Sequence, residues 1–322
     1  MKIGVRIPQY GSTWGQVRDA AVRIEQLGFD GIWVNDHLQS PGRLRTEPTF
    51  DALTALPAVA TLTSRARLGV AVLSATYRPA ALAAKMTSVL DVISDGRLVV
   101  GLGTGSDRDE HAAYDYPFGS PAERSAALID ALDVMQQMRD DPDGAMPNQP
   151  DGRPPIWLAA HKPRLLRLAG QRADGVVAAW VPPDEFAARR AIAEHARDEA
   201  GRSDLAYCLY TFAFAYGSER EALDWLADEA AALGTTPRAL LRWLRTTGVV
   251  GELAEVREVL AAYGPAGATD AVLALPSRVP VDALDALAES VLPTPDDSDD
   301  TPRNRSSSRD NLADLLVEQH RR

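Results

Sequence analysis

Short apolar runs alternate with helix-like segments along most of the chain, and this alternation limits the folds that the chain can adopt. Most of these runs are bounded by turn signals and consist largely of apolar residues, which predicts strands buried on both faces. The expected strands are residues 2–8, 31–34, 68–73, 98–100, 155–160, 175–180, 206–216 and 270–275. The expected helices between and after them are residues 13–28, 50–63, 79–93, 121–139, a helix starting at 163, 183–200, two stretches within 218–246, 251–263 and 280–291.

Buried strands separated by helices predict an α/β fold, in which helices cover a parallel sheet. Eight strand and helix units over about 290 residues fit a closed (β/α)8 barrel, the TIM-barrel fold. A doubly wound open sheet is the alternative, but such a sheet usually has fewer strands and a longer glycine fingerprint at its first turn. We therefore expect the barrel, and we place it in residues 1–292.

The composition changes at Pro293. Residues 293–302 consist mainly of proline, aspartate, serine and threonine, and the arginine and serine residues that follow show no apolar periodicity. Segments of this kind bury too little apolar surface to fold on their own. We expect residues 293–322 to form a disordered acidic linker or tail.

Charge and cysteine content narrow the classes of partner and compartment. The formal net charge is −11, whereas nucleic-acid-binding surfaces are normally basic, so no nucleic-acid partner is expected. Cys208 is the only cysteine, so no disulfide within the chain is possible and a reducing compartment is expected. It lies in an apolar run, which predicts an inert thiol packed in the core. No apolar run is long enough to span a membrane, and the first residues enter a strand without a signal-peptide layout. These features predict a cytoplasmic protein without a membrane partner.

A strand that ends in glycines lies within residues 97–109. Its apolar residues lead into Gly101, Gly103 and Gly105, where the backbone can turn tightly and present N–H groups to an anion. The polar stretch after Gly105 could open a helix whose N-terminus adds positive potential. The spacing is G-x-G-x-G and differs from the dinucleotide-binding G-x-G-x-x-G, so a phosphate-binding turn and a merely tight turn both stay open.

The active site of a (β/α)8 barrel lies at the carboxyl ends of its strands. Two of these ends are small-residue loops, which a broad, flat, phosphate-bearing ligand would need for close approach of the backbone. Lys162 and Arg164 could add charge for the phosphate, and a solvated surface lysine is an equal alternative for Lys162. The histidine and cysteine spacing predicts no metal site. The candidate strand ends are Pro8–Tyr10, Asp36–His37, Ala71–Ser74, Gly103–Ser106, Ala159–Lys162 and Ala179–Trp180.

Several longer motifs occur in a fixed order from residue 1 to about residue 291. They are Gly31–His37, Leu68–Leu73 with Tyr77–Pro79, Leu90–Arg97 leading into Gly101–Gly105, Pro155–Ala160 before Ala173–Gly175, Gly248–Val256 and Gly267–Asp270. With these motifs the chain resembles the luciferase-like monooxygenase superfamily of flavin and deazaflavin enzymes. More narrowly, it resembles the coenzyme F420-dependent oxidoreductases.

The resemblance implies an oxidoreductase that transfers hydride between coenzyme F420 and a small organic substrate. It implies that Asp36 and His37 face the redox ring, and a histidine is suited to donate a hydrogen bond or a proton near neutral pH. A histidine that merely caps the loop is the alternative. The Asp-His pair favours the deazaflavin, because related flavin enzymes more often carry Glu-His there.

The resemblance also implies where the cofactor would lie. A non-proline cis peptide behind the ring would fall at Ala71–Val72, for which an ordinary buried strand is the alternative. Residues 103–106 and 160–162 would hold the phosphate and side chain. The full set of expected cofactor-binding residues is Ala71, Val72, Gly103, Thr104, Gly105, Ser106, Ala159, Ala160, His161 and Lys162.

One position departs from the family's sugar-phosphate dehydrogenases, which carry a glutamate acid immediately after the glycine run. Ser106 occupies that place here, which argues against a sugar-phosphate substrate. Three carboxylates lie nearby but are displaced along the chain: Asp107, Asp109 and Glu110. We keep Asp109 as a candidate acid, with a surface carboxylate as the alternative.

Two other functions stay open at this point. The chain could be an FMN-dependent monooxygenase that uses O₂ and a separate reductase, or a non-catalytic barrel that binds a ligand or partner, because a fold does not determine a function. The resemblance further implies a homodimer. The substrate would depend on the loops at residues 38–50, 106–120 and 236–248, which this scaffold leaves free to vary.

Overall fold

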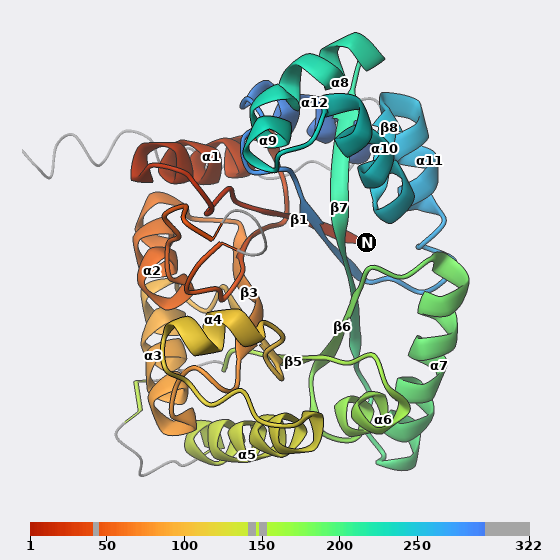
Figure 1. The fold of residues 1–322 in the computed structure, drawn as a ribbon. Helices are drawn as coiled ribbons and strands as arrows, with labels where there is room; N and C mark the ends of the chain where they lie inside the picture. Colours follow the sequence, from red (N-terminus) through yellow and green to blue (C-terminus); the bar gives the residue numbers. More distant parts are fainter. Residues whose placement is uncertain (41–44, 141–145, 148–152, 294–322) are drawn as a thin grey trace, which may run out of the picture. The chain divides into compact units, whose positions relative to one another are not determined.

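The strands of the chain close into a ring. The structure is a computed structural model that describes residues 1–40, 45–140, 146–147 and 153–293. Within these residues the ring runs β1-β2-β3-β4-β5-β6-β7-β9 and returns to β1, with every neighbouring pair parallel (Figure 1). This arrangement confirms the predicted (β/α)8 barrel. The ring strands are β1 (Lys2–Arg6), β2 (Gly31–Val34), β3 (Arg67–Ser74), β4 (Leu98–Gly103), β5 (Ile156–Ala159), β6 (Gly175–Ala179), β7 (Ala206–Tyr216) and β9 (Asp270–Ala274).

A further strand, β8 (Val249–Glu252), lies outside the ring and was not predicted. The last four residues of β7, Ala213–Tyr216, pair with it in parallel, beyond the part of β7 that closes the barrel. We had expected a helix to begin at Gly251, whereas α11 begins at Leu253. A four-residue strand with one neighbour carries too few residues to show a periodicity of its own.

Helices surround the ring of strands (Figure 1). Their ranges lie within a few residues of those expected, with two exceptions: the region 218–246 holds three helices instead of two, and a short helix at 108–113 was not among the expected ranges. The helices of the described residues are α1 (Trp14–Leu27), α2 (Ala52–Leu62), α3 (Ala80–Ile93), α4 (Arg108–Ala113), α5 (Pro121–Asp140), α6 (Pro163–Arg172), α7 (Pro183–Glu199), α8 (Glu219–Trp225), α9 (Ala227–Ala232), α10 (Pro237–Thr247), α11 (Leu253–Ala261) and α12 (Asp282–Val291).

Helix α1 shows how local sequence sets these boundaries. The Thr13 hydroxyl accepts a hydrogen bond from the backbone N–H of Gln16, while the Gln16 side chain accepts one from the backbone N–H of Thr13. This reciprocal cap satisfies two N–H groups that the helix leaves without partners. At the other end Gly28 adopts φ 98°, a left-handed conformation that ends the helix and that glycine adopts at little cost. Both residues confirm the predicted start and stop.

Two tryptophans fill the inside of the barrel. The rings of Trp33 on β2 and Trp157 on β5 stack with centroids 5.5 Å apart. Neighbouring strands carry glycine where a side chain would overlap these rings: a Cβ atom at Gly69 or Gly4 would collide with Trp33, and one at Gly175 would lie 2.5 Å from Trp157. The glycines therefore make room for the interior tryptophans. Cys208 is fully buried in the same inner cluster, as predicted, and burial raises the pKa of its thiol.

Strand β3 departs from regular geometry at the place that the resemblance implied. The Ala71–Val72 peptide is cis, and the pairing between β3 and β4 shifts register between Val70 and Leu73. The glycines of β4 accommodate this bulge, because a Cβ atom at Gly103 would lie 2.5 Å from Cγ2 of Val72. These glycines are thus needed first for packing against β3, whereas we had assigned them to anion binding.

Residues Met1–Leu292 form one compact unit. The predicted disordered tail falls on residues 293–322, of which all but Pro293 lie outside the described residues. Among the helices that the structure describes, none has the length and apolar character to cross a bilayer.

Candidate functional site

A cavity of about 410 Å³ opens at the carboxyl ends of the barrel strands. Ten of the twelve predicted site residues line it, from four different strand ends. They are Asp36, His37, Ala71, Val72, Gly103, Thr104, Gly105, Ser106, Ala159 and His161. Its other lining residues are Arg6, Tyr10, Asn35, Ser74, Tyr77, Val177, Ala179, Trp180, Tyr210 and Phe212.

Two predicted residues do not line this cavity. Ala160 is completely buried in the main core, and Lys162 is exposed at the N-cap of α6. Successive side chains of a strand point to opposite faces, so Ala159 faces the barrel interior while Ala160 faces the helices. Lys162 therefore matches the alternative of a solvated surface lysine.

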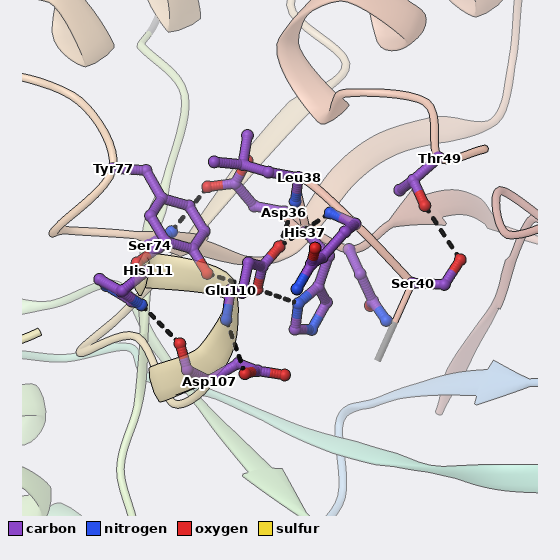
Figure 2. A network of polar contacts seen from close by, with 12 residues as sticks. Asp36, His37, Leu38, Ser40, Thr49, Ser74, Tyr77, Asp107, Glu110 and His111 are labelled. Atoms are coloured by element: carbon purple, nitrogen blue, oxygen red, sulfur yellow. Dashed lines mark hydrogen bonds and ion pairs between the residues drawn. The ribbon is translucent and has the colours of Figure 1, made fainter. Parts of the chain in front are cut away.

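The centre of the site is a buried carboxylate that the sequence analysis passed over. Glu110, on α4, has no exposed surface and accepts four hydrogen bonds (Figure 2). Its Oε2 lies 2.8 Å from Nδ1 of His37 and also accepts the Tyr77 hydroxyl. Its Oε1 accepts the backbone N–H of Leu38 and, at 3.0 Å, that of Gln39. One carboxylate thus holds the His37 ring and the loop after it.

The surroundings keep Glu110 ionised. Burial alone would raise the pKa of its carboxyl, but the hydrogen bonds from His37 and Tyr77 outweigh burial and lower the pKa to about 2. An ionised carboxylate accepts hydrogen bonds and donates none, so Nδ1 of His37 carries the proton in this contact. The Nε2 atom of His37 is then the ring nitrogen available to a molecule in the cavity.

Among the carboxylates that follow the glycine turn, Asp109 matches the alternative of a surface carboxylate, and Glu110 is the one that turns inward. Asp109, which we kept as the candidate acid, has a side chain that is 74% exposed and pairs with Arg45 at 3.0 Å. Asp107 caps α4 by accepting the N–H groups of Asp109 and Glu110. This cap fixes the phase of the short helix so that Glu110 turns inward. Asp109 and Glu110 are adjacent on this helix and point in different directions, one to solvent and one inward. The sequence pattern did not show which of them points inward.

The capping carboxylate also changes the role expected of the α4 N-terminus. We had considered a helix after Gly105 that could present positive potential to an anion, with a merely tight turn as the alternative, and a short helix is present. Its first free N–H groups, however, are taken by Asp107. Gly105 itself adopts φ 70° above the side chains of Ser74 and Thr76. The turn at Gly105 therefore serves as a tight connection between β4 and α4.

Asp36 is directed away from the chemistry that we assigned to it. Its side chain has no exposed surface, and both oxygens lie 2.8 Å from Nη1 of Arg78. One oxygen also accepts the backbone N–H of Ser74 on β3. Burial raises the pKa of this carboxyl, while Arg78 opposes the rise. The contacts tie the end of β2 to the end of β3, so Asp36 positions the loop that carries His37.

His161 lies at the far rim of the cavity beside a second basic residue. Its Nδ1 is 2.8 Å from Nη1 of Arg189 on α7. Burial, followed by the charge of Arg189, lowers the pKa of His161. An anionic group placed here would meet both side chains. This pair was not predicted, because the two residues are 28 positions apart in the sequence.

A larger cavity of about 760 Å³ lies beside this one and shares Arg6 with it. None of the twelve predicted site residues lines the larger cavity, and of the candidate strand ends only Pro8 does. It is formed by α1, α9 and the segment between β9 and α12, away from the His37 and Glu110 pair. We place the candidate active site in the smaller cavity, because the strand ends and the histidine converge there. In the described part of the chain, no group of three or more His, Cys, Asp or Glu side chains could hold a metal ion.

The fold and the site together define a parallel (β/α)8 barrel with a histidine and carboxylate pair at the mouth. The family model described as luciferase-like monooxygenase matches residues 1–279. The chain therefore belongs to the luciferase-like monooxygenase family.

Similarity to individual proteins is more limited. The F420-dependent glucose-6-phosphate dehydrogenase of Kineococcus radiotolerans is 31% identical over 191 residues, or 55% of this chain and 56% of that protein. The F420-dependent hydroxymycolic acid dehydrogenase of Mycobacterium tuberculosis is 35% identical over 169 residues, or 48% of this chain and 46% of that protein. The match spans about half the length of these curated relatives.

A solved structure confirms the barrel over nearly the whole chain. It is an F420-dependent secondary alcohol dehydrogenase in complex with an F420–acetone adduct. The TM-score is 0.74, with 90% of this chain and 98% of that chain covered, and the sequence identity is 17%. At this identity the likeness establishes the fold.

Proposed function

We propose that this chain is an F420-dependent oxidoreductase that interconverts an alcohol and a carbonyl group on a small organic substrate. The observation that carries the proposal is the His37 and Glu110 pair at the cavity wall, with Nδ1 and Oε2 2.8 Å apart. The curated relatives that match in sequence are named as F420-dependent dehydrogenases, which supports the same cofactor here.

The cavity has the shape that a flat ring system needs. On one side its wall consists of Ala71, Val72, Gly103 and Ala159, whose small side chains project little from β3, β4 and β5. The part of the wall from β6 and β7 is aromatic and consists of Trp180, Tyr210 and Phe212. Pockets of this volume hold cofactors and small ligands. We place the ring against the small-residue wall and the anionic side chain of the cofactor toward His161 and Arg189.

The cofactor and the chain divide the chemistry. When bound, coenzyme F420 supplies the acceptor or donor of a hydride. The chain handles the proton: when the alcohol carbon gives up its hydride, the hydroxyl proton passes to Nε2 of His37, and it returns along the same path in reduction. Glu110 keeps Nδ1 protonated and the ring oriented, and its negative charge stabilises the imidazolium that forms. Asp36 positions the same loop through Arg78.

The first experiment titrates the purified full-length chain with F420 and, separately, with FMN, and follows cofactor fluorescence. We expect F420 to bind and FMN to leave the signal unchanged. FMN binding with no response to F420 would replace the proposal with an FMN-dependent monooxygenase. Binding of neither cofactor would leave a non-catalytic barrel.

A second experiment tests the role of His37. We expect His37→Gln to retain F420 affinity within about threefold and to slow turnover by about 10² to 10⁴, the usual contribution of a general acid or base. The matched control is His195→Gln, because the His195 side chain is exposed on α7 and does not line the cavity. Unchanged turnover in His37→Gln would exclude this residue as the proton carrier.

A further inference from the structure

An aromatic wall faces the small-residue wall across the cavity. The rings of Trp180 and Phe212 lie 4.4 Å apart between centroids, and Tyr210 meets Trp180 edge-on at 5.2 Å. Trp243, on α10, extends the group by packing on Phe212 at 5.3 Å. Trp180 is 45% exposed at the cavity lining, and Trp243 beside this group is 48% exposed.

The backbone holds Trp180 in an unusual conformation. Its φ is 57°, in the left-handed region that large side chains rarely adopt. The flanking backbone is fixed on both sides: Trp180 N–H donates to the carbonyl of Tyr210 at 3.0 Å, and the Tyr263 hydroxyl donates to the carbonyl of Val181 at 2.7 Å. Such conformations cost free energy and persist where the surrounding structure enforces them, most often at functional sites. The structure therefore holds the indole ring at the cavity mouth.

The order of the strands places this wall opposite the cofactor position. In the ring β1-β2-β3-β4-β5-β6-β7-β9, strand β7 is four places from β3 in either direction. Ala71 and Val72 lie on β3, whereas Phe212 lies on β7 and Trp180 follows β6. A ring lying against β3 would leave its other face toward Trp180 and Phe212. The space between that face and the aromatic wall is the substrate space.

The charges of the cavity favour an uncharged substrate. Arg6 is buried, and its guanidinium donates to the carbonyl of Leu275 at 2.7 Å. His37 is held by Glu110, and His161 is engaged by Arg189 at the opposite rim. No lysine is among the described residues that line the cavity. The proposed function assigns the His161 and Arg189 pair to the anionic side chain of the cofactor, and the guanidinium of Arg6 is already held by the carbonyls of Ile7 and Leu275. An aromatic ring, in contrast, would find partners for stacking and edge contacts among the lining residues.

We propose that the substrate is an uncharged alcohol or ketone whose reacting carbon is attached to an aromatic ring, and that Trp180 and Phe212 hold this ring. The inference rests on the proposed function and specifies its substrate class. The aromatic ring lies on the wall, and the reacting oxygen points toward Nε2 of His37. The hydride and the proton then leave the substrate in different directions.

The test measures binding directly on the F420-saturated full-length protein. Isothermal titration compares acetophenone with acetone and with glucose 6-phosphate. We expect acetophenone to bind at least tenfold more tightly than acetone, and glucose 6-phosphate to give no heat. Trp180→Gly, which suits the left-handed backbone, should weaken acetophenone about tenfold, a factor typical of losing an aromatic contact, and leave acetone unchanged. The matched control is Trp14→Ala, since Trp14 is a partly exposed tryptophan outside the cavity lining.

The outcomes separate this inference from the proposed function. If the wild-type chain binds no F420, the proposed function and the substrate inference are both wrong. If F420 binds but acetophenone and acetone bind equally, or glucose 6-phosphate binds in preference, the substrate inference alone is overturned. If Trp180→Gly weakens F420 by the same factor as acetophenone, the aromatic wall holds the cofactor and the inference is also overturned. Trp180→Phe should restore most of the acetophenone affinity, which a purely structural defect would not allow.

Discussion

The Nδ1 atom of His37 lies 2.8 Å from Oε2 of Glu110, although 73 residues separate the two in the chain. The contact joins the loop after β2 to α4, which follows β4. His37 and the Ala71–Val72 bulge line the same cavity. Glu110 also accepts the N–H groups of Leu38 and Gln39, so it fixes the loop as well as the ring. The His37 ring at the cavity wall is therefore oriented by a residue that does not itself line the cavity.

The stability of the protein should depend on Glu110 at low pH. The pKa of this carboxyl is about 2 in the folded chain and 4.5 in an unfolded one. Because the folded value is lower, its contribution is fully present above pH 4.5 and is lost as the pH falls from 4.5 toward 2. Urea unfolding of wild type and Glu110→Gln should show a gap that narrows by roughly 2 kcal/mol between pH 5 and pH 3. A gap that is constant over this range would contradict the ionised, hydrogen-bonded state.

Arg78 should matter far more for stability than an exposed arginine does. Removing it in Arg78→Met would leave the buried Asp36 carboxylate without its charged partner and would also break the contact with Asp51, the N-cap of α2. We expect a loss of about 3–5 kcal/mol in the free energy of unfolding, the usual cost of breaking a buried pair. Arg18→Ala, which breaks the exposed pair with Asp19, is the control and should change little. Equal effects in the two variants would argue against the buried pair as an anchor.

The barrel could be predicted from the sequence because its strands are buried on both faces. Runs such as Gly31–Val34 and Asp270–Ala274 are short, apolar and bounded by turn residues, and each of these two strands is entirely buried. β8 escaped prediction because it is four residues long, has one neighbouring strand and lies between two helices. A local pattern of that length does not distinguish a strand from the end of a helix.

The candidate site could be predicted only in part. The strand ends were located correctly because the barrel fold brings them to one face, and the resemblance supplied Asp36 and His37. Which side chain points where depends on features that sequence spacing does not contain. Asp36 turns toward Arg78, Ala160 turns toward the helices, and Glu110 turns inward because Asp107 sets the phase of α4. These orientations arise from tertiary packing.

The turn at Gly105 should tolerate no side chain. Its φ is 70°, and a Cβ atom would lie 2.7 Å from Oγ of Ser74 and from Oγ1 of Thr76. Gly201 is a matched control, because its φ is 68° and nothing lies within 4 Å of its Cβ position. Gly201→Ala should cost about 1–2 kcal/mol from the left-handed backbone alone. Gly105→Ala should cost at least about 1 kcal/mol more and should weaken F420 binding, because α4 and Glu110 shift with the turn. Equal losses of stability would show that the turn has room to adjust.

The interior glycines should be coupled to Trp33. A Cβ atom at Gly69 would overlap the Trp33 ring, and this ring is packed against Trp157 with no space to retreat. Gly69→Ala should therefore destabilise the barrel by about 1–3 kcal/mol, the usual cost of overpacking a core. Trp33→Leu should be destabilising by itself, since it leaves a cavity where the ring was. In the double variant the methyl group that Gly69→Ala introduces enters that space, so the loss of stability should be smaller than the sum of the two single losses. Thermal unfolding of the four proteins measures this difference, and additive losses would mean that the glycine is not there to accommodate the tryptophan.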